Sequence, residues 1–125
     1  HPSSEGSTDS EQVFRHMMDQ IRDYLSTDKI RGTYPAVLRA IKKVFSTFKR
    51  HIDFNMLLSD GNNMYVFSHH SSKTMYMLQR QKEYGGATLI STRNLTTNER
   101  WQKIPRNCLL VLSKGEVLVL SDKII

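Results

Sequence analysis

From Thr8 to Arg50 the hydrophobic residues recur at every third or fourth position, which is the period of an amphipathic α-helix. A capping box predicts where the first helix begins, with Thr8 as the N-cap and Glu11 three residues later. This helix should end between Ser26 and Asp28. Its apolar face comprises Phe14, Met17, Met18, Ile21 and Leu25.

A second helix is predicted to begin near Tyr34 and Pro35, because proline is tolerated in the first helical turn. Gly32 marks the connection before it. The apolar stripe of this helix comprises Val37, Leu38, Ile41, Val44, Phe45 and Phe48. We therefore expect two helices, each with one face available for a core.

After His51 the pattern changes to short extended runs separated by turn residues. Asp60-Gly61-Asn62-Asn63 is a strong signal for a β-hairpin between the first two runs. About six strands are expected, near residues 54–58, 64–68, 74–80, 87–92, 109–113 and 116–120. The last two runs are apolar nearly throughout, which predicts that both of their faces are covered.

Helices followed by strands predict an α+β fold, in which two helices are layered on a mostly antiparallel sheet. The second face of that sheet would need cover, and no third helix is predicted to supply it, which points to a missing partner segment. We expect the following residues to be buried between helices and sheet: Phe14, Met17, Ile21, Leu38, Ile41, Phe45 and Leu57.

The length of 125 residues fits one domain with a core of its own. No apolar run approaches the ~20 residues that span a bilayer. Residues 1–8 are expected to form a mobile lead-in without signal-peptide character. Cys108 is the only cysteine, so neither a disulfide framework nor a cysteine-based zinc site is expected, and a reducing, cytoplasmic compartment is favoured.

The chain carries a net charge of +6, and the excess of basic residues lies between Arg31 and Arg50. On the second helix, the basic side chains lie on or beside the face opposite the apolar stripe: Arg39, Lys42, Lys43, Lys49 and Arg50. We expect a solvated helix face. Contact with nucleic acid is the alternative, but no known nucleic-acid-binding pattern accompanies the charge.

Asp9 is the leading candidate for a functional residue. The predicted capping geometry places its carboxylate in the first helical turn, where the helix dipole favours the ionised form. An ionised carboxylate on a rigid helix end is suited to hold an ammonium group. The simpler interpretation is that Thr8 to Glu11 only cap the helix, and the two roles are compatible because Thr8 can cap while Asp9 points into a cleft.

The histidine spacing does not predict a metal site. His16, His51, His69 and His70 match no helical ligand pair, so we expect scattered surface or hairpin histidines. Cys108 precedes an apolar strand and is expected to be a small core residue. A Cys–His dyad of Cys108 with one of these histidines is the remaining alternative.

The segment from Thr92 to Pro105 is predicted to be a loop. Trp101 is expected to be its packed anchor, with Asn98 and Glu99 satisfying the backbone of the turn. The alternative is that this loop contacts a substrate or a bound partner domain.

Three segments, taken in order, resemble class II glutamine amidotransferases, and in particular the compact bacterial members of the YafJ type. They are Gly6-Ser7-Thr8-Asp9-Ser10-Glu11, Phe54-Asn55-Met56-Leu57-Leu58-Ser59-Asp60-Gly61 and Leu95-Thr96-Thr97-Asn98-Glu99-Arg100-Trp101. The resemblance implies that Asp9 binds the α-amino group of glutamine. It also implies a four-layer α/β/β/α sandwich of the N-terminal-nucleophile hydrolases. Residues 1–125 would be the C-terminal part of one such domain, folded against its missing N-terminal half.

In this family an N-terminal cysteine supplies the nucleophile and the base, an Asn-Gly pair stabilises the oxyanion, and an arginine binds the substrate carboxylate. No position of this chain matches these groups, and residue 1 is His1. The resemblance therefore predicts a chain that supplies scaffold and the substrate ligand Asp9, with no catalytic residue, metal or cofactor of its own. The complete domain would act on glutamine or a γ-glutamyl amide, and this chain alone is expected to be inactive. The alternative function is a non-catalytic binding module whose basic second helix contacts an anionic partner.

Overall fold

The computed structural model describes residues 8–26, 32–48, 53–80 and 87–125, and of residues 8–10 it describes the backbone alone. The chain divides into two compact units. The helical unit comprises His1–Phe54 with Ile124–Ile125, and the strand unit comprises Asn55–Lys123. Within the described residues, neither helix is long and apolar enough to cross a membrane.

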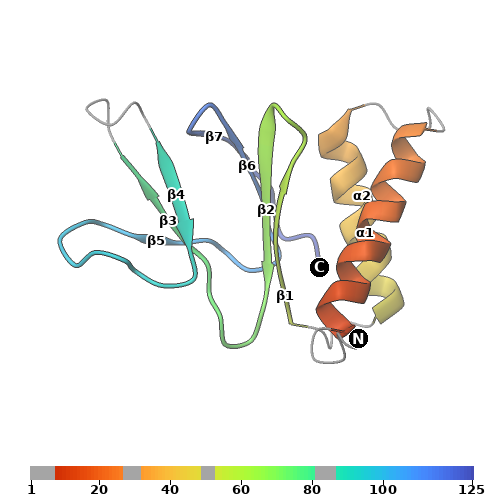
Figure 1. Cartoon of the computed structure of the whole chain (residues 1–125), viewed down its shortest axis with the longest axis horizontal. Coiled ribbons are helices and arrows are strands. Elements are labelled where there is room, and N and C mark those ends of the chain that lie inside the picture. Colours follow the sequence, from red (N-terminus) through yellow and green to blue (C-terminus); the bar gives the residue numbers. More distant parts are fainter. Residues whose placement is uncertain (1–7, 27–31, 49–52, 81–86) are drawn as a thin grey trace. The chain divides into compact units, whose positions relative to one another are not determined.

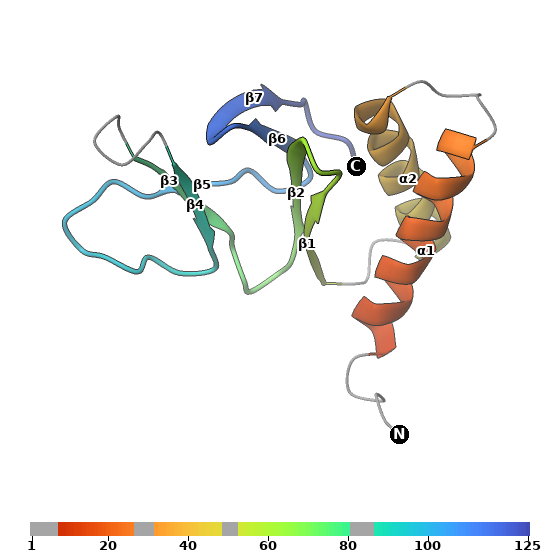
Figure 2. The ribbon, with the colours of Figure 1, turned by 45° about the horizontal axis from the view of Figure 1, so that its top comes forward.

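The helical unit contains α1 (Thr8–Ser26) and α2 (Thr33–Phe48), which lie side by side and contact each other (Figures 1 and 2). Both helices agree closely with the predicted bounds, and Pro35 lies in the first turn of α2 as expected. Gly32 precedes α2 with a φ of 93°, a left-handed conformation that glycine adopts without steric cost. Thr8 is the first residue of α1, and the rest of the predicted lead-in lies outside the described residues.

The buried face of α1 is rotated from the predicted one. Val13, Met17 and Ile21 are buried at four-residue intervals, whereas Phe14 is 40% exposed. Each helical residue turns by about 100° from the one before, so Phe14 lies beside this stripe rather than within it. The prediction that Phe14 is buried was therefore wrong.

The buried residues of α2 follow the predicted stripe more closely: they are Ala36, Val37, Ala40, Ile41, Val44 and Phe45. Leu38 is only half-buried, in contrast to the prediction. The Phe45 ring packs against Phe54, with ring centroids 6.3 Å apart and planes inclined by 58°. The predicted burial of Ile41 and Phe45 is thus confirmed.

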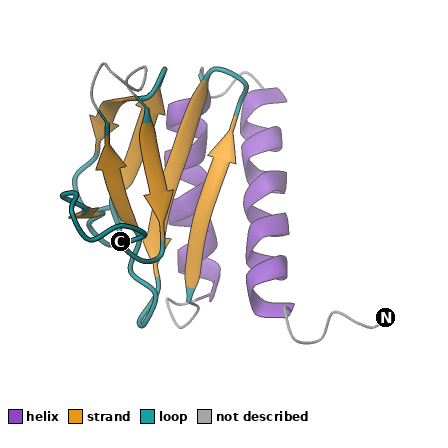
Figure 3. Ribbon diagram, turned by 60° about the vertical axis from the view of Figure 1, so that its left-hand side comes forward, coloured by secondary structure: helices purple, strands orange, loops and turns teal. Residues whose placement is uncertain are grey.

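The strand elements form two sheets (Figure 3). The first has the order β1-β2-β6-β7, from β1 (Phe54–Ser59), β2 (Asn63–His69), β6 (Leu109–Ser113) and β7 (Glu116–Leu120). The second has the order β4-β3-β5, from β3 (Tyr76–Gln79), β4 (Thr88–Ser91) and β5 (Gln102–Lys103). Every strand pair with a described register is antiparallel, which confirms the α+β class.

The sequence predicted every strand except β5. This strand has two residues, which is too short for an alternating pattern to be visible, and it forms only because β3 lies beside it. The residues of the predicted hairpin turn connect β1 to β2, and Lys114-Gly115 connects β6 to β7.

A core within the strand unit lies on one face of the four-stranded sheet. Val66 and Leu110 are paired across β2 and β6, and Leu112 lies on the same face two residues further along β6. They share a buried cluster with Met75 and Ile104, which flank the three-stranded sheet. The two sheets of this unit therefore pack over a common apolar cluster.

The opposite face of β2 and β6 is also buried, through Tyr65, Phe67, Leu109 and Val111. The prediction of two covered faces is confirmed for β6. It was wrong for β7, where Val117, Leu118 and Leu120 are exposed. Leu57 of β1 was also expected to be buried, but it is 50% exposed. The buried residues of β1, Phe54 and Met56, alternate with it along the strand and point to the other face.

Candidate functional site

Asp9 is the second residue of α1, so its backbone lies in the first helical turn as predicted. The side chains of residues 8–10 are outside the described part of the structure, as are Gly6 and Ser7. The carboxylate of an aspartate in this turn experiences the positive end of the helix dipole. The position of Asp9 is therefore confirmed, while its binding of an amino group stays a prediction.

Asp60 has a structural role in the β1–β2 turn. Its Oδ1 accepts hydrogen bonds from the backbone N–H groups of Asn62 at 2.9 Å and Asn63 at 2.8 Å. Its Oδ2 accepts a bond from the Tyr65 hydroxyl at 3.1 Å. Gly61 follows with a φ of 94°. The Ser-Asp-Gly segment of the family-like motif thus specifies a turn, because aspartate satisfies the backbone donors and glycine tolerates the positive φ.

A buried polar cluster lies near the C-terminal end of β2. The fully buried Ser68 donates from its hydroxyl to Asn55 Oδ1 at 2.7 Å. Asn55 in turn donates through Nδ2 to the Lys73 carbonyl at 2.9 Å. These bonds join β1, β2 and the connection to β3, and they satisfy polar groups whose burial would otherwise be costly.

His69 is the next residue along β2, and it is only 9% exposed. Its Nδ1 lies 2.6 Å from Asn107 Oδ1. The amide oxygen can only accept a hydrogen bond, so His69 donates through a protonated Nδ1. The backbone N–H of Asn107 also donates to the Ser68 carbonyl at 2.9 Å. The turn around Asn107 is thereby fixed to the end of β2.

Ser68 and His69 do not form a nucleophile and base pair. Neighbouring residues of a strand point to opposite faces, so the hydroxyl and the imidazole face away from each other. Their described bonds go to Asn55 and Asn107, on different sides. The cluster therefore has the character of a structural network.

The histidine predictions were partly wrong. His69 is buried rather than on the surface, because both faces of β2 are buried from Tyr65 to His69. His16 is half-buried, and its ring contacts the Phe48 ring edge to face, with the ring centroids 5.9 Å apart. His51 lies outside the described residues. Cys108 is a free, half-buried thiol. Among the described residues, no three His, Cys, Asp or Glu side chains are grouped so that they could hold a metal ion.

The loop after β4 is held by a bidentate ion pair. Arg80 donates through Nε to Glu99 Oε2 and through Nη2 to Glu99 Oε1, each at 3.0 Å. The Thr96 hydroxyl donates to Glu99 Oε1 at 2.8 Å, and the Trp101 indole N–H donates to Thr96 Oγ1 at 3.1 Å. The hydrogen bonds from Arg80, then that from Thr96, lower the pKa of Glu99 below its ordinary value of 4.5.

This arrangement supports the predicted anchoring role of Trp101, which is half-buried. It corrects the role of Glu99, whose carboxylate binds the side chains of Arg80 and Thr96 rather than the turn backbone. Nothing in the sequence near Glu99 indicated Arg80, which precedes it by 19 residues.

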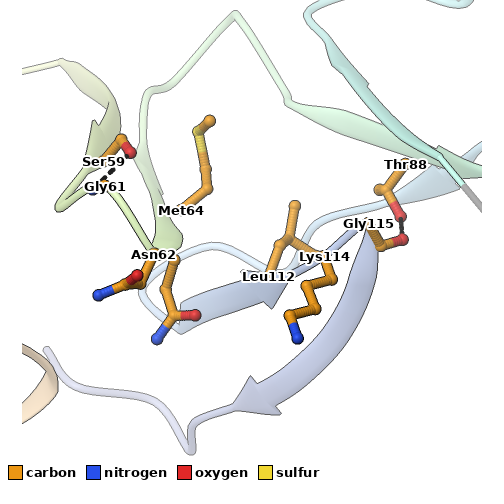
Figure 4. A pocket seen from close by; sticks show the side chains of 9 residues that line it. Ser59, Gly61, Asn62, Met64, Thr88, Leu112, Lys114 and Gly115 are labelled. Atoms are coloured by element: carbon orange, nitrogen blue, oxygen red, sulfur yellow. Dashed lines mark hydrogen bonds between the residues drawn. The ribbon is translucent and has the colours of Figure 1, made fainter.

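An open pocket of about 230 Å³ lies in the strand unit (Figure 4). Thr88 of β4 closes one side of it by donating a hydrogen bond to the Gly115 carbonyl at 2.5 Å. The lining comes from the β1–β2 and β6–β7 hairpins and from β4: Ser59, Gly61, Asn62, Asn63, Met64, Thr88, Leu112, Lys114 and Gly115. The sequence predicted the two turns but not their proximity.

Comparison with known proteins identifies the family. A profile described as "Glutamine amidotransferases class-II" matches residues 3–90, a span that includes Asp9 and the β1–β2 turn. The chain is 30% identical over 120 residues to a candidate glutamine amidotransferase of Escherichia coli, YafJ, covering 79% of this chain and 45% of that protein. It is 26% identical over 132 residues to a candidate glutamine amidotransferase of Haemophilus influenzae, covering 89% of this chain and 43% of that protein.

Solved structures give the same relation at the level of the fold. A crystal structure described as a predicted glutamine amidotransferase from Pseudomonas aeruginosa aligns with a TM-score of 0.67 and 23% identity, over 89% of this chain and 50% of that one. A glutamine aminotransferase class-II domain protein from Silicibacter pomeroyi aligns with a TM-score of 0.59 and 20% identity, over 88% of this chain and 49% of that one. The chain thus spans about half the length of the relatives it matches.

Proposed function

Because the chain belongs to the class-II glutamine amidotransferase family, we propose that it forms one half of a domain that hydrolyses the side-chain amide of glutamine or of a γ-glutamyl compound. The observation that carries this proposal is the family match over residues 3–90, which includes Asp9 in the first turn of α1. The coverage of about half of each relative supports the division into two halves. The rest of the four-layer α/β/β/α sandwich would come from the half that this chain does not cover.

In the proposed reaction, Asp9 binds the substrate and does not react with it. Its carboxylate would pair with the α-ammonium group of glutamine and thereby orient the side-chain amide toward the nucleophile. A charge-assisted hydrogen bond of this kind is about twice as strong as a neutral one. The helix dipole favours the ionised form of a carboxylate in this turn, and a helix end fixes its position better than a loop would.

The nucleophile belongs to the other half in this proposal. An N-terminal cysteine there would attack the amide carbon, ammonia would leave, and water would hydrolyse the resulting thioester. The described residues of this chain would supply one wall of the cleft. The single cysteine, Cys108, follows the turn around Asn107 within the chain and has no free α-amine, so we assign it no part in the reaction. A chain with one thiol and no internal disulfide also suits a reducing, cytoplasmic setting.

Ammonia release from glutamine tests the proposal, with the chain alone and with the chain joined to the part of Escherichia coli YafJ that it does not match. We expect no release by the chain alone and measurable release by the joined protein. Asp9→Asn in the joined protein should raise KM or lower kcat/KM by about tenfold or more, which corresponds to about 1.4 kcal/mol of transition-state stabilisation. Asp19→Asn is the matched control, because Asp19 is an exposed aspartate of the same helix paired with Arg22.

If KM and kcat/KM of Asp9→Asn equal those of the wild type, Asp9 is not part of the substrate site. Strong ammonia release by the isolated chain would contradict the division into halves.

The exposed basic face of α2 supports a second candidate function, binding to an anionic partner. Arg39, Lys42 and Lys43 are all exposed, as expected for a solvated helix face. Lys49 and Arg50 lie outside the described residues. Fluorescence anisotropy with labelled RNA and DNA near physiological salt separates the two functions. Sub-micromolar, sequence-selective binding that is lost in Lys42→Glu/Lys43→Glu would favour the binding module, and so would a steep fall of that binding with salt concentration.

A further inference from the structure

The open pocket between the β1–β2 and β6–β7 hairpins, which we call the hairpin pocket, is lined by both apolar and polar side chains (Figure 4). Its apolar lining residues, Met64 and Leu112, are direct partners across β2 and β6, so their side chains share one face of the sheet. Leu112 belongs to the buried cluster of the strand unit, whereas Met64 is 37% exposed. The apolar lining therefore continues the core outward to a surface that a ligand can reach.

The polar side chains of the lining are not committed to other protein groups. Within the part of the chain that the structure describes, the Lys114 ammonium and the side-chain amides of Asn62 and Asn63 form no hydrogen bond or ion pair. The carboxylate of Asp60 differs, because both of its oxygens accept bonds within its own hairpin. Among the described lining residues, Lys114 supplies the one charged group, so the hairpin pocket favours a negative charge.

The fold holds Lys114 at this position. Lys114 and Gly115 form the two-residue turn between β6 and β7, with φ values of 51° and 78°. The Thr88 hydroxyl donates to the Gly115 carbonyl and thereby ties this turn to β4. Asparagine, aspartate and glycine are the usual residues of such a turn, because they adopt a positive φ more readily than other residues do. A cation thus stands where backbone preference alone favours asparagine.

We propose that the hairpin pocket binds a small monocarboxylate, whose carboxylate pairs with Lys114 and whose short apolar body lies against Met64 and Leu112. One ammonium group balances one negative charge, which suits a carboxylate better than a phosphate group with a charge near −2. The amides of Asn62 and Asn63 are free to donate to the carboxylate oxygens.

The size of the hairpin pocket limits the apolar body of the ligand. Its volume of about 230 Å³ is below the roughly 300–1,000 Å³ of pockets that hold drug-sized ligands. The lining lies within the strand unit, whereas Asp9 belongs to the helical unit. The inference therefore does not rest on the proposed function.

The test is a titration of the 125-residue chain with hexanoate, followed by the amide chemical shifts in nuclear magnetic resonance spectra. We expect shifts at residues 61–64, 88 and 112–115, with a Kd on the order of 1 mM, which a ligand of this size can reach. Hexanol has the same apolar body without the charge and should bind about fivefold more weakly, because an exposed ion pair contributes up to about that factor. Inorganic phosphate lacks the apolar body and should also bind more weakly than hexanoate.

Lys114→Asn removes the cation and suits the turn, so a loss of binding in this variant is not a loss of the hairpin. Its preference for hexanoate over hexanol should disappear, while thermal unfolding shows a stability at least equal to that of the wild type. Lys123→Asn is the matched control, because Lys123 is exposed and lies outside the strands and the lining.

Four results would each overturn the proposal: no shifts at the lining residues, equal affinity for hexanol and hexanoate, phosphate binding as tight as that of hexanoate, or the same effect of the two variants. Hexanoate binding that is lost when the unmatched part of Escherichia coli YafJ is added as a separate chain would assign the hairpin pocket to the interface between the two halves, which also overturns it. Ammonia release is a separate measurement. Hexanoate binding by a protein without glutaminase activity would support the pocket and contradict the proposed function, and activity without hexanoate binding would do the reverse.

Discussion

The Arg80 guanidinium and the Glu99 carboxylate face each other in a bidentate pair, with both N···O distances at 3.0 Å. The pair joins the end of β3 to a loop 19 residues later in the chain. Thr96 and Trp101 complete the arrangement from within the loop. Parallel hydrogen bonds between planar groups give this contact an orientation that a single ion pair lacks.

Removal of the Glu99 charge should loosen the loop. In Glu99→Gln the bidentate pair and the acceptor for Thr96 are weakened, so Trp101 should become more exposed to water. The chain has one tryptophan, and its fluorescence emission should therefore shift to longer wavelength without interference. Glu116→Gln is the control, because Glu116 is exposed at the start of β7; an equal shift in that variant would contradict the anchoring role.

Acidification should have the same effect on the wild-type loop. The pKa of Glu99 is lowered in the folded state by hydrogen bonds from Arg80 and Thr96. A carboxyl group with a lowered folded pKa stabilises the fold above its unfolded pKa, and this contribution is lost as the pH falls through the folded pKa. The Trp101 emission should thus be constant above pH 4.5, the ordinary value for Glu99, and shift at lower pH.

A pH titration of Glu99→Gln provides the comparison. The variant has no carboxyl group at this position, so its Trp101 emission should lack the acidic transition. An identical transition in both proteins would show that other carboxyl groups cause it.

Truncation of a buried α2 residue should be costly. Phe45 is 2% exposed and packs against Phe54, so Phe45→Ala should lower the free energy of unfolding by about 3–5 kcal/mol. Phe14→Ala removes the same ring from a position that is 40% exposed, and it should cost less than about 1 kcal/mol. Urea titration measures both values, and a Phe45→Ala loss under about 1 kcal/mol would contradict the described helix orientation.

Asn107 should contribute both its side chain and its backbone conformation. Its φ of 66° lies in the left-handed region, and its side chain accepts the bond from buried His69. Asn107→Gly still allows the positive φ but leaves His69 without this acceptor, so the variant should lose about 1–3 kcal/mol of unfolding free energy. Asn107→Ala should cost about 1 kcal/mol more, because alanine resists a positive φ. Thermal unfolding of the two variants tests the order, and a more stable alanine variant would contradict it.

The local patterns in the sequence predicted the elements well. The three-to-four-residue period located both helices, and alternation with turn residues located all strands but β5. The placement of Asp9 in the first turn of α1 follows from the same local signals. The aspartate and glycine of the β1–β2 turn were also visible, because their preferences depend on their own backbone.

The partners of distant residues were decided by the tertiary structure. The sequence places Glu99 in a loop, but only the pairing of β3 with its neighbours brings Arg80 to it. His69 is an ordinary polar residue in the sequence, and its burial follows from the position of β2 inside the sheet.

The strands β6 and β7 are equally apolar in sequence, but they differ in burial. The composition of a strand shows that it can be covered, whereas the elements that pack around it decide whether it is. β6 lies between two strands and is buried, while β7 lies at the edge and is exposed. Local structure depends on the conformational preferences of adjacent residues, so a sequence determines it directly. Burial depends on which elements lie alongside, and in this chain that was decided only by the fold.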